Sequence, residues 1–172
     1  MQHRPPITPF DMLLKQINEK MKNIKYKIVV LSGKGGVGKS FISSMLSLAL
    51  ADLGYRVAIL DADIHGSSIP LLLGIEESKI YASEEGIIPA PGPLNTRIIA
   101  INLMLPSPDT PIVWRGPLKA KAIVEVLAKV AWGENDFLVV DLPPGTGDEA
   151  ITIVQTIRDV SGALIVTAPS VL

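Results

Sequence analysis

The chain has 172 residues, a length that fits one domain. Sixteen basic and seventeen acidic residues leave a net charge of −1, so no whole-molecule field favours nucleic acid or a membrane surface as a partner. The sequence contains no cysteine, which excludes disulfides, a thiol nucleophile and thiolate metal ligands within this chain.

The amino-terminal residues predict no targeting segment. Residues 1–9 lack the apolar core of a signal peptide, and no apolar run in the chain approaches the length of a membrane span. We therefore expect a cytoplasmic protein.

A helix is predicted next, with Thr8 as its N-cap, Pro9 at its first position and Asp11 in its first turn. Apolar residues from Phe10 to Ile24 then recur at steps of three to four residues. This spacing is typical of an amphipathic helix that packs on the domain.

A glycine-rich loop follows. Residues 26–31 form an apolar run that predicts a buried strand, and residues 41–53 carry apolar residues at helical spacing. Between them, residues 33–40 have the sequence Gly-Lys-Gly-Gly-Val-Gly-Lys-Ser, which fits the pattern G-x-x-x-x-G-K-[ST]. Glycines let consecutive N–H groups approach phosphate oxygens, and the positive end of the new helix points to the same place.

This loop predicts binding of the phosphates of a nucleotide. Lys39 is expected to reach the β- and γ-phosphates, and the Ser40 hydroxyl to bind Mg²⁺. The nucleotide-binding residues that we predict are consecutive: Gly33, Lys34, Gly35, Gly36, Val37, Gly38, Lys39, Ser40 and Phe41. The alternative is a glycine-rich turn that only joins a strand to a helix.

Further strands and helices alternate along the rest of the chain. Strands are predicted at residues 56–60, 97–103, 137–141 and 163–167, and helical segments at residues 71–74, 118–130 and 149–157. Residues 75–95 are predicted as a loop with a short hairpin at 86–93, and residues 106–116 as a proline-broken connection. Five apolar strands that alternate with helices predict an α/β fold with a doubly wound, mostly parallel sheet and helices on both faces.

Acidic residues follow two of these strands. Asp141 ends one strand, and Asp61 and Asp63 follow another, at the edge where open α/β sheets bind ligands. We expect Asp141 to hold Mg²⁺ through water opposite Ser40, Asp61 to support the water shell of the metal, and Asp63 to orient the attacking water. The alternatives are a capping role for Asp141 and a turn role for Asp61.

Four blocks of sequence together resemble a known family. They are Ser-Gly-Lys-Gly-Gly-Val-Gly-Lys-Ser at 32–40, Asp-Ala-Asp-Ile-His-Gly-Ser-Ser-Ile-Pro at 61–70, Trp-Arg-Gly-Pro at 114–117 and Asp-Leu-Pro-Pro-Gly-Thr-Gly-Asp-Glu at 141–149. With Lys34 in the loop, the chain resembles the deviant Walker A ATPases of the MinD, ParA and nitrogenase-iron-protein superfamily. More narrowly, it is similar to the Mrp/ApbC group of iron–sulfur cluster carriers, from about residue 26 to residue 168.

The resemblance implies an ATPase with ATP and Mg²⁺ as cofactors, which acts as a homodimer that closes over two ATP molecules. Lys34 then reaches the phosphates of the partner and stabilises transition-state charge as an arginine finger does, unless it is a solvated loop lysine. The implied catalytic residues are Lys34, Lys39 and Asp63, and the implied metal residues are Ser40, Asp61 and Asp141. Trp114 and Arg115 are implied either at the dimer surface or at a helix entry.

The resemblance also implies a domain organisation and partners. We divide the chain into an amino-terminal helix and lead-in at residues 1–25 and a P-loop ATPase domain at residues 26–172. The partners are ATP, a second copy of the chain and iron–sulfur client apoproteins, with neither nucleic acid nor membrane.

Two departures from the family pattern limit this transfer. Ser67 stands where the family has proline, which is expected to loosen that segment. The chain also ends after its fifth predicted strand, so we expect it to lack the carboxyl-terminal strands of the family, its adenine-contacting residues and its C-x-x-C pair. Without cysteine, the chain is not expected to bind a 4Fe–4S cluster in the family's way.

Three functions remain open from the sequence. The first is an ATPase in iron–sulfur cluster assembly, and the second is a positioning or partition switch like MinD or ParA. The second needs a basic surface or a carboxyl-terminal amphipathic helix, and neither is visible in the sequence. The third is a truncated nucleotide-binding fragment that acts as a scaffold.

Overall fold

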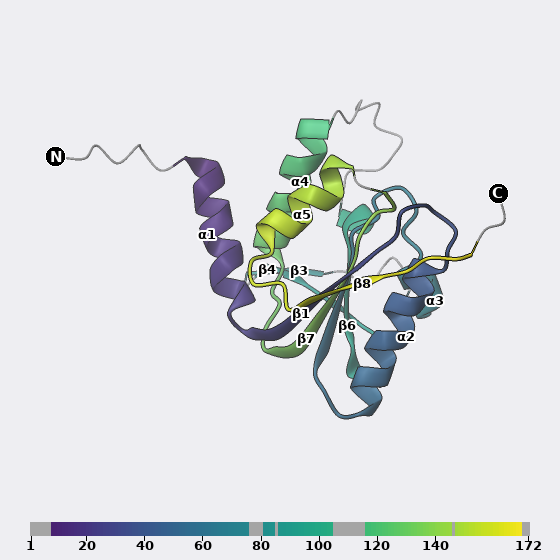
Figure 1. Ribbon diagram of the computed structural model, residues 1–172. Helices are drawn as coiled ribbons and strands as arrows, with labels where there is room; N and C mark the ends of the chain where they lie inside the picture. The colour runs from purple at the N-terminus through teal and green to yellow at the C-terminus, as the bar shows by residue number, and fades with distance from the viewer. Residues whose placement is uncertain (1–7, 76–80, 85, 105–115, 146, 170–172) are drawn as a thin grey trace.

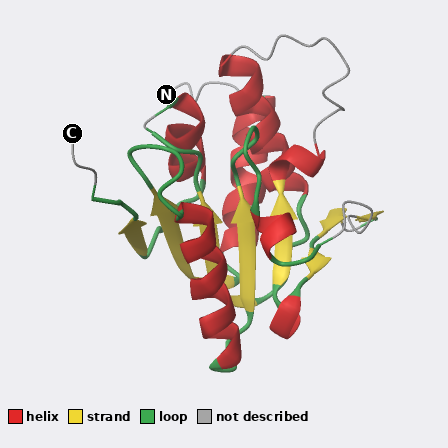
Figure 2. Cartoon of the chain, turned by 90° about the vertical axis from the view of Figure 1, so that its right-hand side faces the viewer, coloured by secondary structure: helices red, strands yellow, loops and turns green. Residues whose placement is uncertain are grey.

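A six-stranded sheet with helices on both faces forms the centre of the molecule (Figures 1 and 2). The computed structural model describes residues 8–75, 81–84, 86–104, 116–145 and 147–169. The strand order is β5-β6-β2-β7-β1-β8, with every neighbouring pair parallel except β5 and β6. The strands are β1 (Ile24–Leu31), β2 (Val57–Asp61), β5 (Ala90–Pro91), β6 (Arg97–Ala100), β7 (Asn135–Asp141) and β8 (Gly162–Ile165).

Two layers of helices cover this sheet. One face carries α1 (Pro9–Met21), α4 (Gly116–Lys129) and α5 (Asp148–Thr156), and the other carries α2 (Lys39–Asp52) and α3 (Ile69–Leu72). A separate antiparallel hairpin pairs β3 (Tyr81–Ser83) with β4 (Gly86–Ile88), and two 3₁₀ turns are η2 (Pro93–Asn95) and η3 (Ile101–Met104). The predicted α/β fold with a doubly wound, mostly parallel sheet is confirmed.

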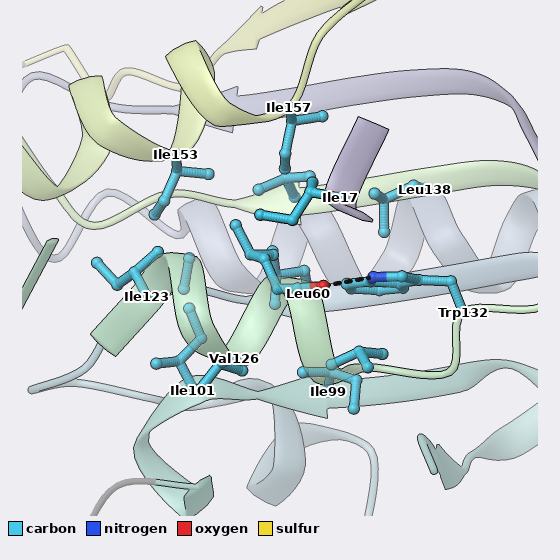
Figure 3. Packing of buried hydrophobic residues seen from close by; sticks show 14 of the residues in the cluster. Ile17, Leu60, Ile99, Ile101, Ile123, Val126, Trp132, Leu138, Ile153 and Ile157 are labelled. Atoms are coloured by element: carbon cyan, nitrogen blue, oxygen red, sulfur yellow. Dashed lines mark hydrogen bonds between the residues drawn. The ribbon is translucent and has the colours of Figure 1, made fainter. Parts of the chain in front are cut away.

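The sheet is buried on both faces by apolar side chains that alternate along its strands. In β7, Leu138 belongs to the larger core cluster beneath α1, α4 and α5, whereas Val139 belongs to the smaller cluster beneath α2 and α3. Figure 3 shows the larger cluster, which includes Ile153 of α5, Ile157 just after α5 and Leu138 of β7. Within the described residues, no helix combines the length and the apolar character needed to cross a membrane.

The strand predicted at residues 97–103 is shorter than expected. Arg97–Ala100 pairs with residues 58–61 of β2, and β2 ends at Asp61. Because the chain has no ladder partner beyond Ala100, it turns away as η3, and Ile101 packs into the larger core instead. The prediction of strand structure for the last three residues was therefore wrong.

The predicted hairpin at residues 86–93 is also displaced. The observed hairpin lies earlier, over β3 and β4, while Ala90–Pro91 joins the edge of the main sheet as antiparallel β5. An edge strand tolerates proline because the missing N–H leaves no central ladder bond unmade. Most of the predicted proline-broken connection lies outside the described residues, as do Trp114 and Arg115.

The first helix begins as predicted. The Asp11 N–H donates to Thr8 Oγ1 (3.2 Å), and the Thr8 N–H donates to Asp11 Oδ2 (2.9 Å), so both members of a capping box are present. The helix ends at Met21, before the predicted Ile24, because Ile24 already pairs with Asn135 as the first residue of β1.

Helix α1 packs into the larger core rather than standing apart from it. Ile17 is fully buried and lies with Leu138, Ile153 and Ile157 (Figure 3). Lys20 Nζ donates to the carbonyl oxygens of Ala128 (2.6 Å) and Val130 (2.9 Å), which satisfies carbonyls at the end of α4. The division of the chain at residue 25 nevertheless stays a prediction.

The substitution Ile17→Ala measures how much α1 contributes to this core. It is expected to lower the free energy of unfolding by about 3 kcal/mol, because it leaves a cavity within the larger core cluster. Urea denaturation followed by circular dichroism gives this value. The matched control is Met12→Ala on the same helix, where the side chain is 58% exposed and little change is expected. If Ile17→Ala lowered the free energy of unfolding as little as Met12→Ala, α1 would not contribute to the stability of the core.

A charged cluster at the amino-terminal ends of the strands connects β1 and β7 with Arg56, the residue before β2. Asp136 accepts hydrogen bonds from Lys25 Nζ (2.7 Å) and from the Arg56 N–H (2.9 Å). These contacts, led by the one from Lys25, lower the pKa of Asp136 to about 2. Because the folded pKa lies below the unfolded value of about 3.9, this contribution to stability is present above pH 4 and is lost as the pH falls towards 2.

Lys25→Ala is expected to raise the pKa of Asp136 towards its ordinary value. The titration of its carboxyl carbon by NMR measures the shift. Lys22→Ala is the matched control, since Lys22 pairs with Glu19 on α1 (2.8 Å) and not with Asp136. A pKa near 2 in the Lys25 variant would assign the shift to the Arg56 backbone instead.

Candidate functional site

The candidate site lies at the carboxyl ends of β1, β2 and β7, which are adjacent in the sheet. The predicted glycine loop connects β1 to α2 there. Gly36 (φ 76°) and Gly38 (φ 87°) adopt left-handed conformations that side chains disfavour. Gly38 is the N-cap of α2, which begins at Lys39, two residues earlier than predicted. The local order of strand, loop and helix therefore matches a phosphate-binding loop.

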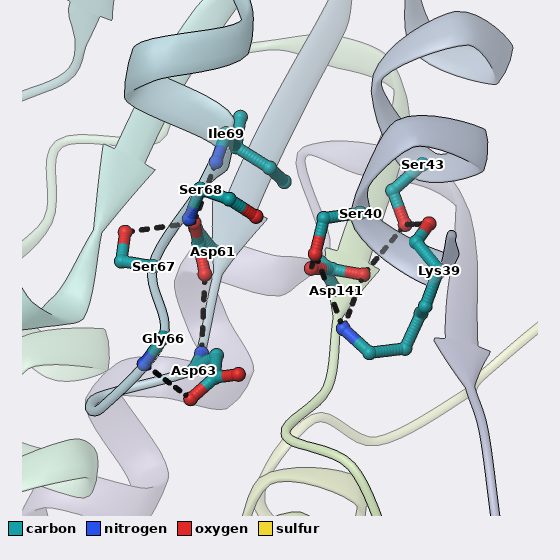
Figure 4. Close-up of polar contacts among 10 residues, drawn as sticks. All are labelled: Lys39, Ser40, Ser43, Asp61, Asp63, Gly66, Ser67, Ser68, Ile69 and Asp141. Atoms are coloured by element: carbon teal, nitrogen blue, oxygen red, sulfur yellow. Dashed lines mark hydrogen bonds and ion pairs between the residues drawn. The ribbon is translucent and has the colours of Figure 1, made fainter. Parts of the chain in front are cut away.

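Three predicted residues meet at this point (Figure 4). Lys39 Nζ lies 2.8 Å from Asp141 Oδ1, in an ion pair whose side chains are 7% and 0% exposed. Ser40 Oγ donates to Asp141 Oδ2 (2.6 Å). The parallel register places Asp141 beside Val30 near the end of β1, which explains why residues a hundred positions apart are in contact.

A fourth residue of this cluster, Ser43, was missed in the sequence. Its hydroxyl donates to Asp141 Oδ1 (2.7 Å) from one turn further along α2, and its side chain is fully buried. The available signal was the position of Ser43 four residues after Lys39, because residues at this spacing share a helix face. Ser43 helps to fix the carboxylate that Lys39 and Ser40 contact.

Asp61 is also buried, and it organises the turn between β2 and α3. Its Oδ2 accepts hydrogen bonds from Ser67 Oγ (2.8 Å) and from the N–H groups of Ser68 (3.1 Å) and Ile69 (3.0 Å). Burial raises the pKa of Asp61, and the hydrogen bond from Ser67 acts in the opposite direction. Ser67, which the resemblance predicts to loosen this segment, instead donates a hydrogen bond that ties the turn to the end of β2.

Asp63 occupies a more open position than Asp61. Its Oδ1 accepts from the N–H groups of His65 (3.2 Å) and Gly66 (2.9 Å), and the side chain is half-buried. A Cβ at Gly66 would lie 3.1 Å from Asp63 Oδ2, so glycine lets the turn approach the carboxylate closely. This close turn holds the Asp63 side chain in place.

These residues surround a cavity of about 350 Å³. Its lining comes from the loop, from α2 and from the turns after β2 and β7: Ser32, Gly35, Gly36, Gly38, Lys39, Ser40, Phe41, Asp63, Gly66, Ser68, Leu72 and Pro144. Of the other predicted loop residues, Gly33 and Lys34 are exposed and Val37 is half-exposed, outside this lining. The Gly145 N–H donates to the Ser32 carbonyl (2.9 Å), which ties the segment after β7 to the base of the loop.

The donor set at Asp141 and Ser40 fits Mg²⁺. Mg²⁺ prefers oxygen ligands and uses one or two protein groups, with water and phosphate oxygens completing its shell. A hydroxyl and a carboxylate 2.6 Å apart beside the cavity provide such groups. Over the part of the chain that the structure describes, no three His, Asp or Glu side chains gather into a larger metal site.

Most of the sequence matches the model of a known protein family. Residues 23–172 match the family model described as ParA, NUBPL iron-transfer P-loop NTPase. The chain belongs to this ParA/NUBPL family. The resemblance to P-loop ATPases of the iron–sulfur cluster carrier group is thereby confirmed.

Individual relatives agree with this assignment to the ParA/NUBPL family. The chain is 51% identical over 155 residues to an iron–sulfur cluster carrier protein of Saccharolobus solfataricus, a match that covers 90% of the chain and 52% of the relative. The chain spans about half the length of the curated relatives it matches.

Solved structures show the same ParA/NUBPL fold. A nucleotide-binding protein from Archaeoglobus fulgidus in complex with ADP superimposes with a TM-score of 0.77 at 40% identity, over 94% of this chain and 60% of that one. The septum site-determining protein MinD of Pyrococcus horikoshii, complexed with Mg-ADP, has a TM-score of 0.52 at 23% identity, over 85% of this chain and 59% of that one. The MinD likeness concerns the fold alone.

Proposed function

We propose that this chain binds Mg-ATP, hydrolyses it and dimerises in response, as the nucleotide-dependent part of iron–sulfur cluster assembly or transfer in the cytoplasm. The observation that carries the proposal is the buried contact of Asp141 with Lys39 and Ser40, two residues that line a glycine-rich cavity. Membership of an iron-transfer P-loop NTPase family and the cluster carrier relative support the biological role.

In this proposal each residue has a distinct task. Lys39 leaves Asp141 and binds the β- and γ-phosphates of ATP. Asp141 and Ser40 then hold Mg²⁺, which neutralises phosphate charge when it is bound. Asp63, held by its turn at the cavity, orients the attacking water, while Asp61 supports the metal's water shell from the adjacent strand end.

Lys34 acts between two copies of the chain. It is exposed on the loop, and no partner for its ammonium group occurs among the described residues. An exposed cation beside a phosphate site can reach the γ-phosphate in a second copy, where it stabilises charge that develops during phosphoryl transfer. Hydrolysis therefore depends on dimerisation.

The iron–sulfur cluster is cargo in this proposal. The sequence contains no cysteine, so no thiolate of these 172 residues holds the cluster. Client apoproteins supply the cysteine ligands, while this chain supplies the nucleotide-dependent switch.

Titration calorimetry of the chain with Mg-ATP tests the central claim, together with an assay for phosphate release. Binding with slow hydrolysis is expected. Light scattering with and without Mg-ATP tests dimerisation, for which the expected result is a doubled mass only with nucleotide. Absence of binding would overturn the proposed function, whereas binding with unchanged mass would remove only its dimerisation step.

A further inference from the structure

Ser32, the residue immediately before the glycine loop, has a buried hydroxyl group that makes no hydrogen bond with the described residues. The residue is 1% exposed, and its Oγ has no hydrogen-bond partner among the described residues. A buried hydroxyl without a partner destabilises a fold, and most such groups in proteins are satisfied. Ser32 therefore requires an explanation that the nucleotide-free fold does not give.

The surroundings of Ser32 identify where a partner would come from. Ser32 lines the same cavity as the loop glycines, Lys39 and Pro144. Its backbone is already engaged, because its carbonyl accepts from the Gly145 N–H (2.9 Å). The backbone of Ser32 is thus tied to the segment after β7, beside the phosphate loop.

We propose that Ser32 is a phosphate-binding residue whose hydroxyl donates a hydrogen bond to a phosphate oxygen of the bound nucleotide. This inference rests on the proposed function and adds a residue to its site. A hydroxyl carries one donor, and an anionic phosphate oxygen accepts a charge-assisted bond from it. The nucleotide then supplies the partner that the fold lacks.

Ser44 provides an internal control. It is fully buried in α2, and its Oγ also has no hydrogen-bond partner in the described part of the chain. Ser44 does not belong to the lining of the cavity. The two serines share burial and the missing hydrogen bond, and they differ in their access to the nucleotide.

The experiment compares Ser32→Ala and Ser44→Ala with the parent chain. Titration calorimetry is carried out with Mg-ADP and with the magnesium complex of a nonhydrolysable ATP analogue, and thermal melting is recorded without nucleotide. Ser32→Ala is expected to weaken binding by about tenfold or more, and Ser44→Ala to leave it within about twofold. Both variants are expected to melt at or above the temperature of the parent, because each removes an unsatisfied hydroxyl.

The two nucleotides locate the contact. Loss of affinity for both assigns Ser32 to a phosphate that ADP and ATP share, and loss for the analogue alone assigns it to the terminal phosphate. Ser32→Cys is a second variant, with nearly the same shape as serine but a weaker hydrogen-bond donor. It replaces Ser32→Ala in the binding measurements if the alanine variant does not fold.

Three results would count against the proposal. Unchanged affinity in the Ser32 variants, with binding by the parent intact, overturns the role of Ser32 and leaves the proposed function standing. A lower melting temperature for both Ser32 variants shows that the hydroxyl serves the nucleotide-free fold, and overturns it too. No binding by the parent overturns the proposed function and this inference together.

Discussion

Replacing Lys39 with alanine is expected to abolish nucleotide binding and to weaken the fold at the same time. Binding suffers because the ammonium group that reaches the phosphates is removed, with an expected loss of at least about a hundredfold. Folding suffers because Asp141 is fully buried and loses its cation. Breaking a buried ion pair on one side lowers the free energy of unfolding by about 3 kcal/mol.

Titration calorimetry and urea denaturation measure the two effects of Lys39→Ala. The control is the double variant Lys39→Met with Asp141→Asn, which removes both charges and retains most of the volume. Its stability is expected to recover, because no uncompensated buried carboxylate remains. It is expected to remain unable to bind Mg-ATP, because it still lacks the Lys39 ammonium group. Full stability in Lys39→Ala alone would show that Ser40 and Ser43 suffice to hold Asp141.

Lys34→Ala is expected to act on turnover instead. Hydrolysis should fall by about a thousandfold, the loss typical when a cation that contacts the transferred phosphoryl group in trans is removed. Mg-ATP affinity and thermal stability should remain close to those of the parent, because Lys34 is exposed and its side chain makes no hydrogen bond or ion pair with a described residue. Phosphate release under saturating Mg-ATP, with parallel calorimetry, separates these quantities.

A mixing experiment tests whether Lys34 acts across a dimer. In a mixed dimer of the Lys34→Ala and Asp63→Ala variants, the first chain keeps its own Asp63 and receives Lys34 from the second. One complete site is thus restored, and activity should exceed that of either variant alone. If the single Lys34 variant hydrolyses ATP at the parent rate, the solvated loop lysine is the correct alternative.

The sequence predicted the parts of the site that are formed by consecutive residues. The glycine loop, the strand before it and the helix after it are consecutive, so their order was evident from residues 26–53. The position of Asp141 opposite Ser40 was also expected, because open α/β sheets bind ligands at the carboxyl ends of their strands, but their direct hydrogen bond was not.

The remaining features depend on distant parts of the chain. Ser43 reaches Asp141 only because β7 lies beside β1, and the Ser67 contact with Asp61 depends on how one turn folds back on a strand end. Strand β6 ends at Ala100 because of where its neighbour ends, which no pattern within residues 97–103 contains. The partner strand, rather than the strand propensity of its own residues, determines where β6 ends.

The ion pair of Lys39 with Asp141 also has a kinetic consequence. While the two side chains hold each other, the carboxylate that would receive the metal is engaged by an ammonium group. Under the proposed function, a divalent cation alone would meet a carboxylate whose charge Lys39 already neutralises, whereas nucleotide phosphates would draw Lys39 away from Asp141. Under the proposed function, the metal is therefore expected to enter with the nucleotide or after it, and free magnesium alone is expected to leave the nucleotide-free protein unchanged.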